Sequence, residues 1–154
     1  MVAPPRRTPQ AVLFACGQNS VRSPMAASLL QRMFPQRLYV RSAGVKKGEL
    51  DPFAVAVIAE LGQDISGHKP QTFEELEDWE GLNFDLIVTL APEAHHAALE
   101  LTRTLAADVE YWPTPDPTTT EGSREQKLQA YREVCDTLIM RIRRRFSKVG
   151  AASE

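Results

Sequence analysis

Cysteine is scarce in this chain of 154 residues, which contains only Cys16 and Cys135. Two cysteines cannot build the disulfide framework of a small secreted domain or a zinc site made of thiolates. Histidine is also rare, and the adjacent pair His95 and His96 would point in different directions on a helix, as surface residues rather than metal ligands. We therefore expect a protein of the reducing cytoplasm that uses no metal and no other cofactor.

Long hydrophobic runs are missing as well. No apolar segment approaches the roughly 20 residues that a membrane-spanning helix needs. Residues 1–10 lack the apolar centre of a signal peptide, so we expect them to form a flexible N-terminal arm. A net charge of −2 provides no basic surface for nucleic acid. We accordingly expect neither a membrane nor a nucleic acid among the partners.

The chain does have the composition of an ordinary globular domain. Hydrophobic residues account for 43% of the chain and charged residues for 25%, which are typical values for a soluble protein. The length suits one hydrophobic core, and no segment is repeated. We expect one domain at residues 11–148, followed by a C-terminal tail at residues 149–154.

Segments typical of strands alternate with segments typical of helices along this domain. Apolar runs predict strands at residues 11–15, 38–42, 84–90 and 109–112. Amphipathic patterns predict helices at residues 24–34, 52–61, 73–79, 92–105 and 123–147. Ser23, Asp51 and Thr72 stand at the N-cap positions of three of these helices. Such alternation predicts a parallel sheet with right-handed crossovers.

The segment between the first strand and the first helix carries the main chemical groups. Cys16 leaves the strand, a short turn follows, and Arg22 arrives at the helix start. Such a turn can aim backbone N–H groups and the positive end of a helix dipole at one point, which suits an anion. The thiolate of Cys16 could then attack a phosphoryl group whose oxygens are held by Arg22. A buried cysteine and an unrelated surface arginine are the alternative, but strand, cap, proline and helix all fall in register.

A second chemical group lies in residues 113–122, where three prolines within five positions prevent regular structure. Asp116 precedes one of these prolines. A carboxylic acid there could protonate a leaving group and then activate water, although a turn-forming aspartate would fit as well. Because the carboxyl ends of parallel strands share one edge, we expect Cys16, Arg22 and Asp116 to lie together.

These residues resemble the low-molecular-weight protein tyrosine phosphatase superfamily, which includes thioredoxin-coupled arsenate reductases. The resemblance rests on four segments that occur in the family's order, at residues 16–24, 42–44, 64–68 and 116–117. It implies an α/β fold whose four-stranded parallel sheet has the order 2-1-3-4, with helices on both faces and a phosphate loop after the first strand. It also implies catalysis through a cysteinyl-phosphate intermediate.

The resemblance assigns roles to individual residues. Cys16 would be the nucleophile, Arg22 the oxyanion clamp and Asp116 the general acid. The phosphate-binding residues would be Gly17, Gln18, Asn19, Ser20, Val21, Arg22 and Ser23. The hydrogen-bond network beneath the loop would comprise Asn19, Ser23, Ser42 and His68. An ordinary loop histidine is the alternative for His68.

The chain also departs from the family's usual pattern. Gln18 occupies a position that is usually glycine, and the glycine comes one residue earlier as Gly17. Gln18 would therefore alter the loop or place an amide in the pocket. Residues 118–120 are threonines where some members have aromatic residues, and Phe53 is the one aromatic residue within residues 48–53. A preference for phosphotyrosine stays open for this reason.

We predict a cysteine-dependent phosphomonoesterase similar to protein tyrosine phosphatases, acting on a phosphorylated protein or a small phosphoester. Phosphate or sulfate should be able to occupy its loop. Ala91 stands where related reductases carry a cysteine, and Cys135 lies on the apolar stripe of the last helix, where we expect inert core packing. An internal cysteine relay is therefore excluded, while an arsenate reductase that uses an external small thiol stays open. A phosphate-binding module without turnover is a third possibility, against which the complete set of Cys, Arg and Asp argues.

Overall fold

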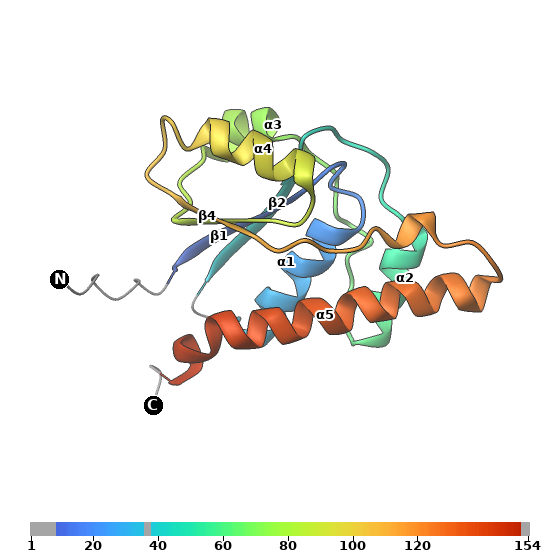
Figure 1. Cartoon of the computed structure of the whole chain (residues 1–154). Coiled ribbons are helices and arrows are strands. Elements are labelled where there is room, and N and C mark those ends of the chain that lie inside the picture. The colour runs from blue at the N-terminus through green and yellow to red at the C-terminus, as the bar shows by residue number, and fades with distance from the viewer. Residues whose placement is uncertain (1–8, 36–37, 152–154) are drawn as a thin grey trace.

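The computed structural model of the protein describes residues 9–35 and 38–151, with side chains described up to Phe146. Its strands form one parallel sheet in the order β2-β1-β3-β4, with helices on both faces (Figure 1). The strands are β1 (Ala11–Cys16), β2 (Tyr39–Gly44), β3 (Leu86–Thr89) and β4 (Asp108–Tyr111). The predicted α/β class and strand order are confirmed.

Strand β1 forms the centre of the molecule because its apolar residues are covered on both faces. Alternate side chains of a strand point to opposite faces, and Val12 and Phe14 belong to one hydrophobic core while Leu13 and Ala15 belong to the other. All four are fully buried. A continuous apolar run therefore becomes a central strand, and Cys16 at its end is placed beside Gly44 at the end of β2.

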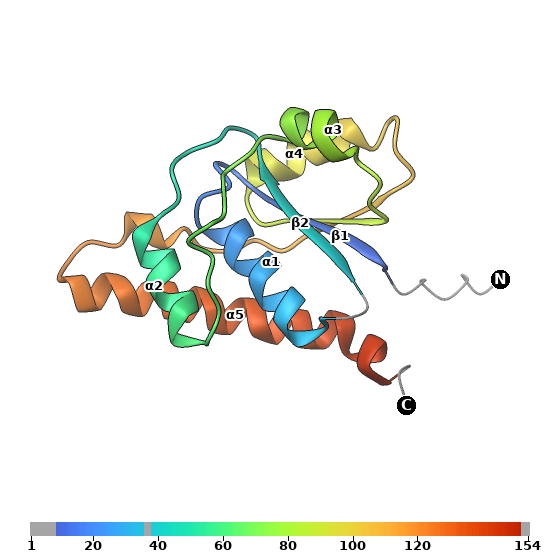
Figure 2. The same cartoon turned by 180° about the vertical axis from the view of Figure 1, so that it is seen from behind.

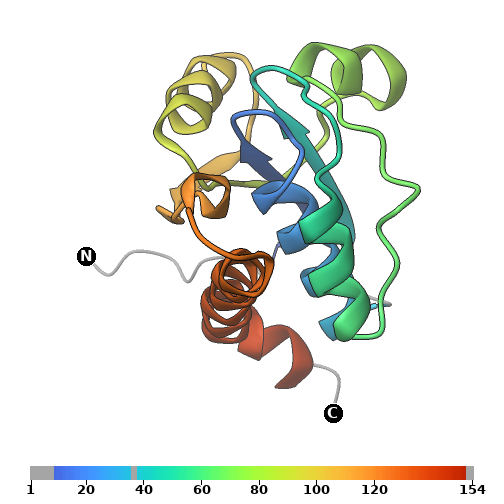
Figure 3. The ribbon, with the colours of Figure 1, turned by 90° about the vertical axis from the view of Figure 1, so that its right-hand side faces the viewer.

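The helices form one layer on each face of the sheet (Figures 1 and 3). The first layer contains α1 (Arg22–Met33), α2 (Pro52–Glu60) and α5 (Arg124–Ala151), and the second contains α3 (Phe73–Glu80) and α4 (Pro92–Leu101). The larger core lies under the first layer and includes Met25, Leu30, Ile58 and Leu138. The smaller core lies under the second layer and includes Leu76, Ile87 and Ala98. The sheet is thus packed between two hydrophobic cores, one under each layer of helices.

Two of the three predicted helix caps are confirmed. Asp51 Oδ1 accepts a hydrogen bond from the N–H of Phe53 at 2.8 Å, and Thr72 forms a capping box with Glu75. The prediction for Ser23 was wrong, since α1 begins at Arg22 and has no side-chain cap. The Ser23 hydroxyl is buried and makes hydrogen bonds inside the loop instead.

The connection between α2 and α3 crosses from one face of the sheet to the other past the edge at β2 (Figure 2). It is attached to the end of β2, where the N–H of Gly44 donates to the carbonyl of Gln71 at 2.9 Å and Gly44 forms a bridge with Thr72. This crossing carries His68 and Gln71 to the edge of the sheet at which β1 ends.

The predicted domain bounds, residues 11–148, stay a prediction, because the flanking segments are described only in part. Residues 1–8 of the expected arm and residues 152–154 of the expected tail lie outside the described residues. Gln10 is tied to the sheet, because its N–H donates to the Asp85 carboxylate at 2.9 Å and its carbonyl accepts from Tyr39. Helix α5 continues to Ala151, beyond the expected domain end at residue 148. Within the described part of the chain, no helix combines the length and apolar character needed to cross a membrane.

Candidate active site

The chemical groups gather at the edge of the sheet where the parallel strands end, which we call the carboxyl edge. Figure 3 looks onto this edge, where the loop between β1 and α1 lies between the segment that follows β2 and the segment that follows β4. Hydrogen bonds join all three segments, since Val45 N–H donates to the carbonyl of Cys16 at 3.2 Å and Arg22 donates to the carbonyl of Thr114 at 2.9 Å. Ligands of open parallel sheets bind at this edge.

The loop after β1 leaves a row of backbone donors without partners. The N–H groups of residues 17–21 make no hydrogen bond with any described residue. The carbonyl groups of the loop are instead bonded to the segment after β2, in the pairs Lys46 with Gly17, Gly48 with Gln18 and Asp51 with Ser20, at 2.9, 2.9 and 3.2 Å. Free N–H groups next to a helix start are a site for an anion. We call residues 17–22 the anion loop.

Asn19 holds the anion loop in shape from within. Its backbone has the left-handed conformation, with φ of 56°, which asparagine tolerates better than most residues. Its buried side chain accepts a hydrogen bond from the N–H of Gln71 at 2.9 Å and donates to Ser23 Oγ at 2.9 Å. The loop is therefore fixed to the segment that crosses the edge of the sheet.

The same network determines what the Cys16 sulfur meets. Because the Gln71 N–H can only donate, it fixes the orientation of the Asn19 amide, whose NH₂ group then donates to Ser23 Oγ. The Ser23 hydroxyl lies 2.9 Å from Cys16 Sγ, within hydrogen-bond distance of the sulfur. A thiolate can only accept, so the hydroxyl would donate to the ionised form of Cys16.

His68 supports the loop from behind. Its Nε2 lies 3.1 Å from Asn19 Oδ1 and 3.2 Å from the carbonyl oxygen of Asn19. Both partners are acceptors, so Nε2 carries a hydrogen. Burial lowers the pKa of His68 below its ordinary value, although the hydrogen bond to the Asn19 backbone acts in the opposite direction. A neutral imidazole is therefore favoured as the structural partner of Asn19.

Ser42 joins the network differently from our expectation. It is buried in β2, but its carbonyl, not its hydroxyl, takes part, by accepting a hydrogen bond from Gln71 Nε2 at 3.1 Å. Gln71 therefore connects Asn19 with Ser42 and was missed by the sequence analysis. Nothing in the sequence near Gln71 indicates this role, which arises because residues 61–72 cross the sheet edge at this point.

Arg22 is held in place by the segment after β4. Its Nη1 donates to the carbonyl of Thr114 at 2.9 Å, and the side chain is half-buried. Thr114 is itself buried and fixed, because its N–H donates to the carbonyl of Leu90 at 3.1 Å and its hydroxyl to that of Trp112 at 2.8 Å. Thr114 was also missed, since it acts through a backbone carbonyl that any residue would provide.

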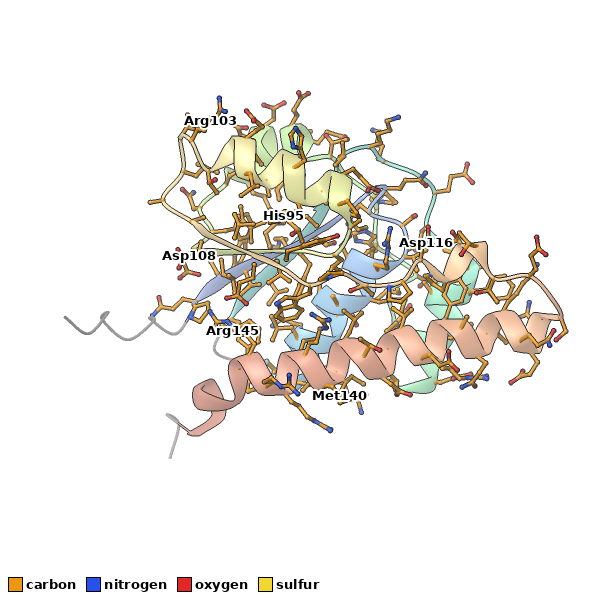
Figure 4. The ribbon with its side chains drawn as sticks, in the orientation of Figure 1. His95, Arg103, Asp108, Asp116, Met140 and Arg145 are labelled. Atoms are coloured by element: carbon orange, nitrogen blue, oxygen red, sulfur yellow. The ribbon has the colours of Figure 1, made fainter. Side chains whose placement is uncertain are left out.

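Asp116 lies two residues beyond Thr114, in an exposed position that caps the short 3₁₀ helix η1 (Pro117–Thr119). Its Oδ1 accepts hydrogen bonds from the N–H and the hydroxyl of Thr118, at 3.0 and 2.6 Å. Figure 4 shows Asp116 on the segment that passes the N-terminal end of α1. The structure therefore brings Cys16, Arg22 and Asp116 to the same edge of the sheet.

This geometry agrees with a comparison to known families, in which the model of the low molecular weight phosphotyrosine protein phosphatases matches residues 11–153. The chain belongs to this phosphatase family. The expected family resemblance is thereby confirmed. The match extends over all strands and helices described here.

Relatives within the phosphatase family carry two kinds of name. An arsenate reductase of Bacillus licheniformis is 32% identical over 139 residues, covering 90% of this chain and 96% of that protein. A low molecular weight protein tyrosine phosphatase from T. tengcongensis has a TM-score of 0.72 at 25% identity, covering 90% of this chain and 99% of that one. A structure described as an arsenate reductase in the phosphate binding state has a TM-score of 0.69 at 25% identity, covering 90% and 98%. Family membership alone does not choose between the two activities.

A pocket of about 620 Å³ opens beside the anion loop of this phosphatase family member. Its lining residues are Gln18, Ser20, Glu49, Leu50, Asp51, Pro52, Phe53, Pro117, Thr118, Lys127 and Tyr131. Gln18 contributes to the pocket lining, and its amide oxygen lies against Gly48 in the segment after β2. The pocket adjoins the loop and the residues that follow Asp116, so it is placed to receive the group attached to a bound phosphate.

Tyr131 belongs both to the larger core and to the wall of this pocket. It is buried, and its ring lies 5.5 Å from that of Phe53. Its hydroxyl donates to Asp51 Oδ2 at 2.7 Å. Burial, the hydrogen bond to Asp51 and the charges of Asp51 and Asp116 all raise the pKa of Tyr131 above its ordinary value. The sequence signal for this polar contact was the hydroxyl of Tyr131, which stands among apolar residues on the same face of α5.

His95 and His96, which we predicted to be surface residues, differ in their surroundings. Among the described residues, no group of three or more His, Cys, Asp and Glu side chains could hold a metal ion. His96 is exposed as expected, but His95 is half-buried between α4 and the sheet (Figure 4). His95 Nδ1 lies 2.9 Å from Thr89 Oγ1, and its ring stacks on Tyr111 at 4.6 Å. Aromatic stacking therefore overrides the surface position that we predicted for His95.

Cys135 is buried in the core under α5. Burial, with smaller contributions from the charges of Asp136 and Glu60, raises the pKa of its thiol to about 12. Because the thiolate is the reactive form of cysteine, this side chain is unreactive at neutral pH.

Proposed function

We propose that this family member is a cysteine-dependent phosphomonoesterase similar to protein tyrosine phosphatases. The observation that carries the proposal is the row of free N–H groups at residues 17–21, flanked by Cys16 at one end and Arg22 at the other. Donors fixed in advance around a developing negative charge are a major source of catalytic power. The substrate would be a phosphorylated protein or a small phosphoester, with phosphate or sulfate able to occupy the loop, and the enzyme would act in the cytoplasm.

The first chemical step would transfer the phosphoryl group to Cys16. The thiolate attacks phosphorus, the bond between phosphorus and the ester oxygen breaks, and Asp116 gives its proton to the departing oxygen. The loop N–H groups and the guanidinium of Arg22 bind the three equatorial oxygens. Asn19, Ser23 and His68 keep the loop and the sulfur in position throughout.

The second step would release phosphate. The carboxylate of Asp116 takes a proton from a water molecule, which attacks phosphorus and breaks the bond between phosphorus and sulfur. Inorganic phosphate leaves, Cys16 returns to the thiolate, and Asp116 is again protonated. Both steps use groups of this chain alone, so the proposal requires no cofactor.

Asp116→Asn tests the proposed general acid. An alkyl phosphate, whose leaving group needs a proton, should be hydrolysed roughly a hundredfold more slowly, and an activated nitrophenyl phosphate only a few-fold more slowly. The basic limb of the pH–rate profile should flatten. The measurement is kcat for both esters across pH, with Asp108→Asn as the matched control, because Asp108 begins β4 at the opposite edge of the sheet. Equal slowing of both esters with an unchanged basic limb would remove Asp116 from this role.

Arsenate reduction with an external small thiol is the second candidate, and the relatives named arsenate reductases favour it. An internal relay is not available, because the chain has two cysteines and Cys135 is buried with a raised thiol pKa. A reductase of this kind would therefore need a thiol from solution to resolve the adduct formed at Cys16.

A direct comparison of the two activities separates the candidates. We expect release of phosphate from phosphopeptides and small phosphoesters to exceed arsenate turnover with a small thiol or with thioredoxin. Cys135→Ser should leave phosphatase activity nearly unchanged, because that thiol is buried in the core under α5 and its raised pKa makes it unreactive. Arsenate turnover that exceeds every phosphoester would favour the reductase, and its loss in Cys135→Ser would contradict the exclusion of a relay.

A further inference from the structure

Glu93, in the first turn of α4, lies directly against the anion loop. A methyl group added to Gly17 would come within 2.6 Å of Glu93 Oε1 and 3.6 Å of its Cδ. A side chain at residue 17 would have to displace the end of the Glu93 side chain, which is exposed and flexible. The carboxylate therefore lies beside the anion loop at Gly17.

The charge of Glu93 is not neutralised by a neighbour. Its carboxylate has no ion pair or hydrogen bond with any described residue. The other ionisable groups that the structure places at the loop are Cys16, Arg22, Lys46, Asp51, His68 and Asp116. A free carboxylate beside N–H groups that suit an anion opposes the binding of that anion, because the two negative charges repel.

Helix stability offers a simpler account, since an acidic residue in the first turn of a helix is favourable. That account requires only that the carboxylate face the helix start, and does not predict contact with Gly17. Because Glu93 lies so close to the anion loop, we expect its charge to affect the binding of an anion there.

We propose that Glu93 is a charge-selecting residue of the active site. Its carboxylate weakens the binding of free dianions such as inorganic phosphate, and it selects phosphoesters with neutral or positively charged neighbouring groups over those with acidic ones. The effect on anion binding is independent of turnover. The selection among esters rests on the proposed phosphatase function.

Alkylation of Cys16 measures the local charge effect directly. Iodoacetate is negatively charged and iodoacetamide is neutral, but both react with the Cys16 thiolate. Both rates are proportional to the fraction of thiolate, so this fraction drops out of their ratio. The ratio therefore reports the electrostatic potential at Cys16. In a Cys135→Ser background, Glu93→Gln should raise the iodoacetate to iodoacetamide ratio by roughly two- to fivefold at low salt, and Glu93→Lys by more. High salt should reduce these differences.

Calorimetric titration with inorganic phosphate gives a second readout. Phosphate should bind more tightly in the order parent, Glu93→Gln, Glu93→Lys, while Glu93→Asp should stay near the parent. Glu100→Gln is the matched control, because it makes the same change about 10 Å further along α4. An unchanged ratio and affinity in the Glu93 variants would overturn the proposal, as would equal changes in Glu100→Gln. If the Glu93 variants changed only in thermal stability, the role of Glu93 would be confined to stabilising the start of α4, and the proposal would be overturned.

Paired phosphopeptides test the selection of substrates. The two peptides differ only in a lysine or a glutamate beside the phosphorylated residue, and the ratio of their kcat/KM values should move toward the acidic peptide in Glu93→Gln. An unchanged ratio would overturn this part of the proposal. Failure of the phosphatase function has a different signature, because the parent would then hydrolyse neither peptide while the alkylation result would be unaffected.

Discussion

Replacing Cys16 by serine is expected to abolish hydrolysis of phosphoesters. The sulfur is buried and lies 2.9 Å from Ser23 Oγ, which can donate a hydrogen bond to the thiolate form. A serine hydroxyl at this position would have no base to remove its proton, whereas nucleophilic catalysis needs an activated group. Turnover of a nitrophenyl phosphate should fall to the level of the uncatalysed reaction, as measured by release of nitrophenol.

The fold should survive this change, because serine is close to cysteine in size. Cys16→Ser should therefore still bind inorganic phosphate through the free N–H groups of residues 17–21. Circular dichroism and a phosphate titration distinguish this result from unfolding. Cys135→Ser makes the same substitution on α5, outside residues 16–22, and serves as the control. Near-normal turnover by Cys16→Ser would show that another group is the nucleophile.

Arg22→Lys should reduce turnover by roughly a hundredfold or more, an effect comparable with the loss of an oxyanion donor. Lysine keeps the positive charge but loses the planar pair of donors that matches two phosphoryl oxygens. It would also lose the geometry by which Arg22 Nη1 is anchored to the carbonyl of Thr114. The measurement is kcat and KM for a nitrophenyl phosphate, with the larger change expected in kcat.

Arg32→Lys provides the matched control for this variant, because Arg32 is exposed in the last turn of the same helix. Its turnover should equal that of the parent. An Arg22→Lys activity within a few-fold of the parent would contradict a two-pronged clamp, and charge alone would then explain the contribution of Arg22.

The order of strands and helices was largely readable from the sequence because it depends on local patterns. The apolar run of β1, the cap at Asp51 and the capping box at Thr72 each involve neighbouring residues whose chemistry limits the backbone. Element ends were less predictable, since α4 stops at Leu101 and α5 continues to Ala151. Ser23 misled the prediction because a hydroxyl can cap a helix or bond within a loop, and only the position of Asn19 decides which.

The sequence by itself determined that Cys16 and Arg22 flank a turn between a strand and a helix, because that spacing is local. The tertiary structure decided which distant residues hold the turn. Gln71 fixes Asn19, the carbonyl of Thr114 anchors Arg22, and Glu93 lies against Gly17. These contacts join segments that are far apart in the chain, and two of them use backbone atoms that every residue has. Local sequence patterns cannot predict such contacts, because they form only when the folded sheet brings distant segments to one edge.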